Sequence, residues 1–169
     1  MSAWKNNIQK HKNIIVFVSV FVALLFVDLL TKWLTNGFEG TVIPGFLNFT
    51  SFHNPGIAFG LLAGQRVLVL VVNSLLIVGA FVAWWFFARK DMALNVALAI
   101  FLAGAVGNHW DRIFYGHVRD FIDFSFTMTV MNLADVFLTI GTVLVIIAVL
   151  VQTFRKEKPT EEEAVTDEA

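Results

Sequence analysis

Four long apolar stretches dominate this chain and confine most of its polar residues to the connections and tails. The stretches cover residues 14–34, 67–87, 92–108 and 132–154. A helix of about 20 residues crosses a hydrocarbon core of about 30 Å. None of the stretches alternates between polar and apolar positions, and backbone groups in lipid must be hydrogen-bonded internally, so we expect helices rather than barrel strands. The pattern predicts an all-α membrane protein with a bundle of four transmembrane helices.

The composition supports a membrane protein and excludes several types of functional site. Hydrophobic residues make up 57% of the 169 positions and charged residues 15%, whereas an ordinary soluble domain carries about 25% charged residues. The chain has no cysteine, which excludes disulfides, thiolate metal sites and cysteine nucleophiles. The first stretch is too long for a signal peptide and no small-residue cleavage site follows it, so we expect it to be retained.

The basic residues predict how the helices are oriented, because cytoplasmic connections are rich in Lys and Arg. Eight of them gather at one end of the predicted bundle: Lys5, Lys10, Lys12, Arg89, Lys90, Arg155, Lys156 and Lys158. Only Arg66, Arg112 and Arg119 lie in the opposite connections. We therefore expect both termini in the cytoplasm and the connections 35–66 and 109–131 outside. The acidic tail, residues 155–169, is expected to be disordered.

The first outer connection has the signature of a small β element. It is rich in glycine, alternates in places between residues 42 and 52, and has turn signals at Pro44-Gly45 and Pro55-Gly56. We predict an extracytoplasmic β-cradle over residues 36–64.

Ionisable residues lie unexpectedly close to the outer ends of the apolar stretches. Asp28 and Lys32 are four residues apart, so they share a helix face and can form an ion pair. Asp28 would lie about 9 Å below the outer edge of the span. The pair either orients the helix or faces a polar cavity, where ionisable groups at such depth are usually found.

Two further aspartates suggest acid–base chemistry. Asn132 is placed to cap the fourth helix, which puts Asp135 at its third position, so capping alone is one explanation for that carboxylate. In an extended chain, Asp120 shares its side with Val118 and Ile122, against an apolar surface. Apolar surroundings and a second carboxylate both favour a retained proton, as an aspartic protease requires. Spacing alone does not choose the pair.

Asp111 and Asp123 therefore stay as alternative members of the catalytic pair. Each also has a simpler explanation: Asp111 could form a surface ion pair with the neighbouring Arg112, and Asp123 could be a solvated loop charge.

Five segments in order resemble the bacterial lipoprotein signal peptidase (type II signal peptidase) family. They are residues 28–32 (DLLTK), 54–59 (NPGIAF), 104–112 (GAVGNHWDR), 118–122 (VRDFI) and 132–135 (NLAD). These are similar to the family's Asp-x-x-x-Lys, Asn-x-Gly-x-Ala-Phe, Gly-x-x-Gly-Asn-x-x-Asp-Arg, Val-Val-Asp-Phe-Ile and Asn-x-Ala-Asp motifs.

The resemblance implies an aspartyl endopeptidase of the cytoplasmic membrane. It would cleave signal peptides from prolipoproteins on the N-terminal side of a diacylglyceryl-modified cysteine, at the extracytoplasmic face. Asp120 and Asp135 match the catalytic dyad. Substrate-binding and supporting roles would fall to Asp28, Lys32, Asn54, Gly56, Asn108, Asp111, Arg112 and Asn132. The resemblance implies no metal, no cofactor and no nucleic acid; its partners would be the prolipoprotein and membrane lipid, and we expect a monomer.

The chain departs from the family pattern at several positions. Leu29 replaces a usual Gln, Arg119 replaces a Val beside the dyad, and Met131 and Val136 replace Phe and Ser. Arg119 would lower the pKa of Asp120 if it lay close, although alternation on an extended strand points it away.

Other functions make different predictions. A small transporter or channel would continue its polar residues toward the cytoplasmic end, yet the fourth stretch is almost wholly apolar after Thr142. A non-catalytic assembly or lipid-binding protein would use its carboxylates as caps and ion pairs. The chain contains neither the His-Glu-x-x-His motif of a zinc peptidase nor the Gly-x-Ser-x-Gly motif of a serine hydrolase, which argues against both functions. The side chains of Phe52, Phe59, Phe121 and Phe124 either cover an acylated cysteine and exclude bulk solvent or pack at the membrane interface.

Overall fold

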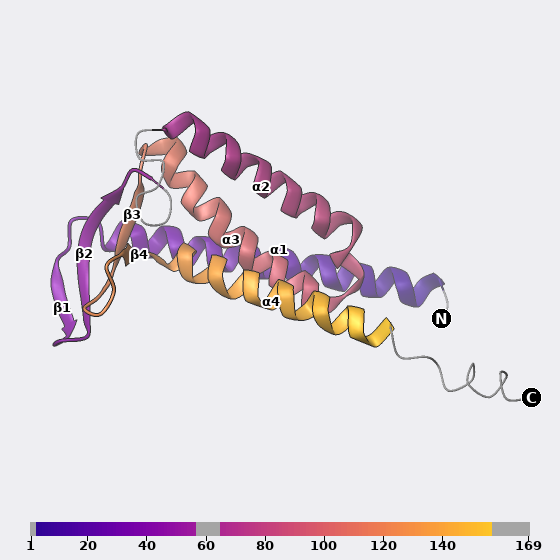
Figure 1. Cartoon of the computed structure of the whole chain (residues 1–169). Coiled ribbons are helices and arrows are strands. Elements are labelled where there is room, and N and C mark those ends of the chain that lie inside the picture. Colours follow the sequence, from indigo (N-terminus) through magenta and orange to yellow (C-terminus); the bar gives the residue numbers. More distant parts are fainter. Residues whose placement is uncertain (1–2, 57–64, 157–169) are drawn as a thin grey trace, which may run out of the picture.

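A computed structural model describes residues 3–56 and 65–156 (Figure 1). Its helices are α1 (Ala3–Leu34), α2 (Arg66–Phe86), α3 (Met92–Phe114) and α4 (Leu133–Lys156), and a short 3-10 helix, η2 (Ala88–Lys90), joins α2 to α3. Its strands are β1 (Gly40–Ile43), β2 (Leu47–Asn54), β3 (Val118–Phe124) and β4 (Val130–Met131). The last part of the predicted cradle, residues 57–64, and most of the acidic tail, residues 157–169, lie outside the described residues.

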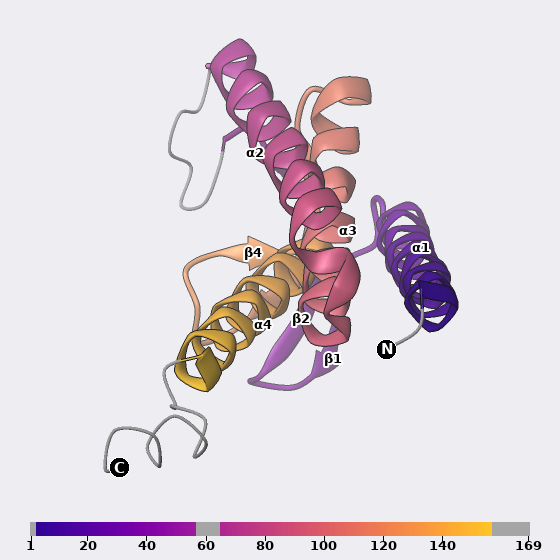
Figure 2. The ribbon, with the colours of Figure 1, turned by 90° about the vertical axis from the view of Figure 1, so that its right-hand side faces the viewer.

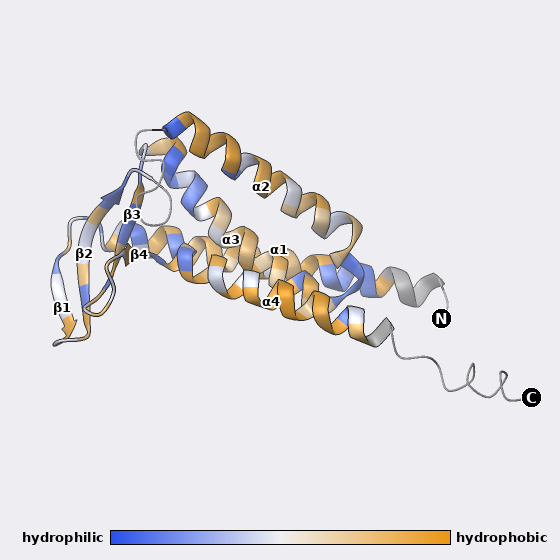
Figure 3. Cartoon of the chain, viewed as in Figure 1, coloured by the Kyte–Doolittle hydropathy of each residue, from blue (hydrophilic) through white to orange (hydrophobic). Residues whose placement is uncertain are grey.

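Four of these helices are long and apolar enough to cross a membrane: Ile8–Leu34, Arg66–Phe86, Met92–Phe114 and Leu133–Phe154. Figure 3 shows apolar residues along their middle parts, with polar residues concentrated at the two ends of the bundle. The predicted fold class is therefore confirmed: a bundle of four apolar helices carries a small antiparallel sheet.

Helix α3 forms the core of the bundle and contacts α1, α2 and α4, which lie around it (Figure 2). In its apolar window 56% of the residues are buried, against 6–11% in the other three helices, whose exposed side chains are apolar. Small residues allow the close approach of its neighbours. A side chain at Gly104 would strike the Ala134 carbonyl oxygen, and one at Gly141 of α4 would strike the backbone of Phe101.

Helix α3 is longer than the third apolar stretch. The stretch was predicted to end at residue 108, and the helix continues to Phe114. One face of this last part of α3 is buried and carries Asn108, Asp111 and Arg112, whereas Trp110, Ile113 and Phe114 are exposed. A spacing of three and four residues puts the three polar side chains on one helix face. The first helix also begins earlier than the predicted residue 14, at Ala3.

The sheet lies at one end of the bundle, opposite the ends at which α1 begins and α4 finishes (Figure 1). Its order is β1-β2-β3-β4, and all neighbours are antiparallel. The predicted turn at Pro44-Gly45 joins β1 to β2, with Gly45 at a φ of +73° that favours glycine. The second outer connection supplies β3 and β4, which the prediction of a cradle within residues 36–64 missed.

Candidate active site

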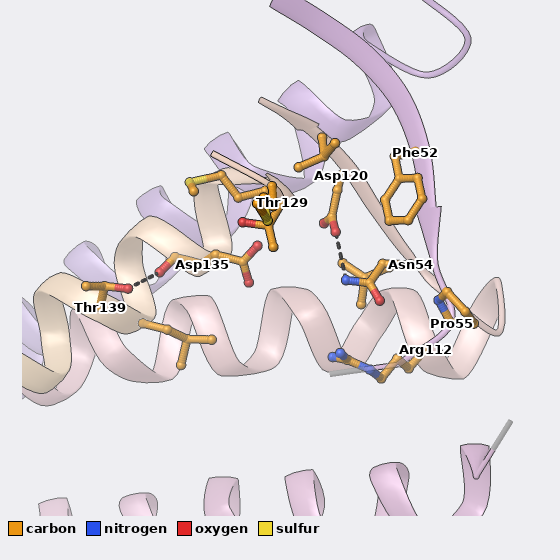
Figure 4. Close-up of a pocket in the computed structure, with 13 residues that line it drawn as sticks. Phe52, Asn54, Pro55, Arg112, Asp120, Thr129, Asp135 and Thr139 are labelled. Atoms are coloured by element: carbon orange, nitrogen blue, oxygen red, sulfur yellow. Dashed lines mark hydrogen bonds between the residues drawn. The ribbon is translucent and has the colours of Figure 1, made fainter. Parts of the chain in front are cut away.

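Asp120 on β3 and Asp135 at the start of α4 line the same cavity, which has a volume of about 830 Å³. Figure 4 shows both side chains directed into this space. Asp120 is only 2% exposed, whereas Asp135 is half-buried. The fold therefore brings together the two aspartates that the resemblance singled out.

Two asparagine side chains hold the carboxyl group of Asp120. Asn54 Nδ2 donates to Asp120 Oδ2 at 3.0 Å, and Asn132 Nδ2 donates to Asp120 Oδ1. Backbone N–H groups set the orientation of both amides, because a backbone N–H can only donate. Gly56 N donates to Asn54 Oδ1 at 3.0 Å, and Asp135 N donates to Asn132 Oδ1 at 3.1 Å. Each amide nitrogen is thereby turned toward Asp120.

Asp135 is both a helix cap and a wall of the cavity. Asn132 N donates to its Oδ2 at 3.1 Å, which completes a reciprocal capping arrangement with the bond from Asp135 N to Asn132 Oδ1. Asn108 Nδ2 donates to its Oδ1 at 2.7 Å. Capping, proposed from the sequence as the simpler explanation, is therefore present, and it fixes the carboxylate in the cavity.

Burial raises the pKa of Asp120 to about 6, and the negative charge of Asp135 acts in the same direction. The hydrogen bonds from Asn54 and Asn132 oppose this rise because they favour the charged carboxylate. Asp120 therefore takes up a proton far more readily than an ordinary aspartate does.

A buried group of charges supports the pair from behind. Lys32 Nζ lies 2.9 Å from Asp28 Oδ2 and donates to Asn108 Oδ1 at 3.0 Å, so the ammonium group fixes the amide that holds Asp135. Asp28 Oδ1 accepts from Ala134 N at 2.8 Å, which joins α1 to the first turn of α4. The ion pair predicted between Asp28 and Lys32 is present.

Asp111 does not form the surface ion pair with Arg112 that we considered. It is fully buried, and its partners are Arg119, with Nη2 at 2.8 Å from Oδ1, and Lys32 at 3.6 Å. Arg119 N also donates to Asp111 Oδ2 at 3.0 Å, which ties the start of β3 to α3. Alternation along β3 directs the Arg119 side chain to Asp111, while the neighbouring Asp120 faces the amides of Asn54 and Asn132.

Arg112 borders the cavity and joins it to the chain after β2. Its Nη2 donates to the Gly56 carbonyl oxygen at 2.7 Å, and its Nη1 donates to the Asn108 carbonyl oxygen at 3.3 Å. Asn54 and Arg112 line the cavity directly, whereas Asn108 and Asn132 hold the carboxyl groups from behind.

The apolar wall differs from the one we expected. Phe52 lines the cavity, but Phe121 packs against Phe49 and Phe124 against Phe46, and Phe59 lies outside the described residues. The remaining wall comes mainly from the β3–β4 turn, β4 and α4: Met128, Thr129, Val130, Met131, Leu138 and Thr139. These residues carry no motif, so only the folded chain reveals their role. Within residues 3–56 and 65–156, no group of three or more His, Asp or Glu side chains is arranged to hold a metal ion.

The fold and the cavity define a multi-pass membrane protein with a carboxylate-lined site at one end of its helix bundle. The family to which the chain belongs is signal peptidase (SPase) II, whose model matches residues 20–151. Lipoprotein signal peptidases of Staphylococcus aureus strains JH9 and Newman are each 35% identical over 160 residues, covering 88% of this chain and 97% of theirs.

Solved structures agree with this assignment. A bacterial membrane enzyme determined by the in meso method at 2.3 Å resolution is 33% identical, with a TM-score of 0.78 over 85% of this chain and 93% of that one. A second, at 1.9 Å, is also 33% identical, with a TM-score of 0.72 over 79% and 92%. The chain is therefore a membrane protease of lipoprotein processing. The family assignment favours the peptidase predicted from the sequence over the transporter and over the non-catalytic assembly protein.

Proposed function

We propose that the protein is an aspartyl endopeptidase in which Asp120 and Asp135 form the catalytic dyad. The observation that carries this proposal is that two aspartates from separate elements line one cavity and are joined by one network of amides. Asn132 links them directly, since its side chain bonds to Asp120 and its backbone to Asp135.

The two carboxyl groups have different environments, which supports different roles. Asp120, with its raised pKa, is the general acid that donates a proton to the oxygen of the scissile carbonyl. Asp135, which is half-buried and sits in the first turn of α4 with its oxygens facing the Asn108 amide and the Asn132 backbone N–H, acts as the general base. It takes a proton from water as the water oxygen bonds to the carbonyl carbon.

The tetrahedral intermediate then carries two hydroxyl groups. When its C–N bond breaks, the protonated Asp135 gives its proton to the leaving nitrogen, and one hydroxyl returns a proton to Asp120. The products are a carboxylic acid and an amine, and both aspartates regain their starting protonation states. No metal or cofactor enters this sequence of steps.

The walls of the cavity support a lipid-modified substrate. Phe52, Met128, Val130 and Leu138 offer apolar surface beside the polar dyad. A prolipoprotein whose cysteine carries a diacylglyceryl group would present an extended peptide and acyl chains together. We infer cleavage on the N-terminal side of that cysteine, as the resemblance implies.

The orientation follows from the distribution of basic residues. Arg89 and Lys90 lie at the end of the bundle opposite the sheet. We propose that this end is cytoplasmic, with both termini, and that the sheet and the dyad face outward. We further propose that the protein acts as a monomer.

The decisive experiment compares Asp120→Asn and Asp135→Asn with the unchanged protein in detergent, using a diacylglyceryl-modified prolipoprotein peptide. Each variant should fold and lose cleavage. Full activity in either one refutes the dyad. Asp123→Asn is the matched control, since Asp123 lies on the same strand but does not line the cavity. Equal turnover of the unmodified peptide would refute recognition of the lipid.

A further inference from the structure

Arg66, the first residue of α2, is bound to the last turn of α3. Its Nη2 donates to the carbonyl oxygens of Arg112 at 3.1 Å and Ile113 at 3.2 Å. Carbonyl groups in the last turn of a helix lack intrahelical partners, and a guanidinium group at this end also meets the negative pole of the helix. Among the described residues Arg66 has no acidic partner within salt-bridge distance.

The chain after α3 leaves room for this contact. Gly116 adopts a φ of +81°, and a Cβ at this position would lie 3.3 Å from Arg66 Nη1. The positive φ favours glycine, and the absent side chain lets the guanidinium group lie against the backbone. The arrangement is thus supported from both sides, by the end of α3 and by the turn that follows it.

Hydrogen bonds continue from this contact to the proposed acid. Arg112, whose carbonyl accepts from Arg66, donates from Nη2 to the Gly56 carbonyl oxygen at 2.7 Å. Gly56 N donates to Asn54 Oδ1 at 3.0 Å, and Asn54 Nδ2 donates to Asp120 Oδ2 at 3.0 Å. The series therefore runs from the backbone of Arg112 through its guanidinium group to the Gly56 backbone, and from there through the Asn54 amide to Asp120.

We propose that Arg66 is a positioning residue that holds Arg112 and Gly56 so that the Asn54 amide stays directed at Asp120. The inference rests on the proposed function, since it gives Arg66 its effect through the general acid. Arg66 itself is exposed and is absent from the lining of the cavity, so it acts through the other residues.

The effect on kinetics can be stated in advance. Without Arg66, the last turn of α3 loses two hydrogen bonds and the bond from Asn54 to Asp120 lengthens or breaks. Loss of one hydrogen bond of about 1 kcal/mol corresponds to an approximately fivefold fall in kcat. Because the Asn54 bond lowers the pKa of Asp120, its loss should also move the alkaline limb of the pH–rate profile upward. A residue that only stabilised the fold would leave that limb in place.

The test measures kcat, KM and the pH profile of Arg66→Ala, Arg66→Lys and the control Gln65→Ala on the lipid-modified peptide. Gln65 is exposed at the same helix end and makes no capping hydrogen bond from its side chain. Arg66→Ala should show the fivefold loss and the shifted limb, Arg66→Lys should recover part of both, and Gln65→Ala should match the unchanged protein. If Arg66→Ala fails to fold, Arg66→Met, which keeps an apolar stem and removes the donors, carries the same expectation.

A double variant with Asn54→Ala tests the route. Once Asn54 is removed, Arg66→Ala should have little further effect on kcat, because both changes interrupt one series of bonds. An unshifted limb, or a full additional loss in the Asn54→Ala background, overturns the inference. Inactive Asp120→Asn together with unchanged Arg66→Ala would end this inference alone, whereas active Asp120→Asn would end the proposed function.

Discussion

The buried carboxyl group of Asp120 should make the protein less stable as the pH rises, and Asp120→Asn should remove this dependence. Burial and the charge of Asp135 raise the pKa of Asp120 from its ordinary value of 3.8 to about 6. The folded protein therefore binds this proton more tightly than the unfolded chain does. The resulting stability is fully present below pH 3.8 and is lost as the pH rises through 6.

The magnitude follows from the two pKa values. The gap between 3.8 and about 6 corresponds to about 3 kcal/mol of unfolding free energy lost by neutral pH. In Asp120→Asn the new amide nitrogen would face the amide nitrogen of Asn54 or Asn132, and losing one hydrogen bond costs about 1 kcal/mol. The variant should thus be less stable than the unchanged protein by about 0.5 kcal/mol at pH 4 and more stable by about 2 kcal/mol at pH 8.

The assay is unfolding in mixed detergent micelles, titrated with a denaturing detergent and followed by tryptophan fluorescence at several pH values. Comparison at each pH cancels the contributions of titrating groups that do not interact with Asp120. Gly79→Ala on α2 is the control, because it changes no titratable group and its new methyl group would meet nothing within 4 Å. The reasoning fails if the difference between Asp120→Asn and the unchanged protein is the same at pH 4 and pH 8.

Three further predictions concern the same site. Since the general acid must be protonated, kcat/KM should fall as the pH rises through about 6, the pKa of Asp120, and a rate that keeps rising to pH 8 would contradict this role. Gly107→Ala places a methyl group against the Asp28 carboxylate, so it should abolish activity and lower the midpoint of thermal unfolding. Gly79→Ala meets no neighbouring atom and should stabilise the fold by about 0.5–1 kcal/mol. Equal thermal midpoints for the two variants would refute the steric argument. Lys32→Met leaves Asp28 buried without its cation and should cost about 3–5 kcal/mol in denaturing-detergent titrations, and a cost below about 1 kcal/mol would contradict the buried pairing.

The sequence predicted the helices better than their ends. Apolar length is enough to identify a span, because lipid demands it, but α3 contacts protein on most sides and so tolerates polar residues. Hydropathy therefore ended the third span at 108, although buried Asp111 and Arg112 continue the helix to Phe114. The joining of β3 to β2 was equally hidden, because strand pairing depends on segments more than 60 residues apart in sequence.

The candidate site was predictable as a set of residues but not as a set of contacts. The capping of α4 by Asn132 is local and could be read from spacing. The partner of Asp111 could not, because Arg119 reaches it only after the chain has turned at Gly116. The same holds for the wall formed by Met128 and its neighbours, whose residue types are common on any membrane surface.

The two proposed catalytic groups differ because their backbones differ. Asp120 lies in the first half of β3, which is buried and contacts α3. Its carboxyl group is therefore withdrawn from water and its pKa is raised. Asp135 lies at the third position of a helix, where backbone N–H groups and the positive end of the helix dipole face a carboxylate. One residue type thus provides a proton donor and a proton acceptor within a single cavity. Which aspartate donates the proton and which accepts it is therefore set by the backbone around each residue. A substitution of the side chain alone would not exchange the two roles.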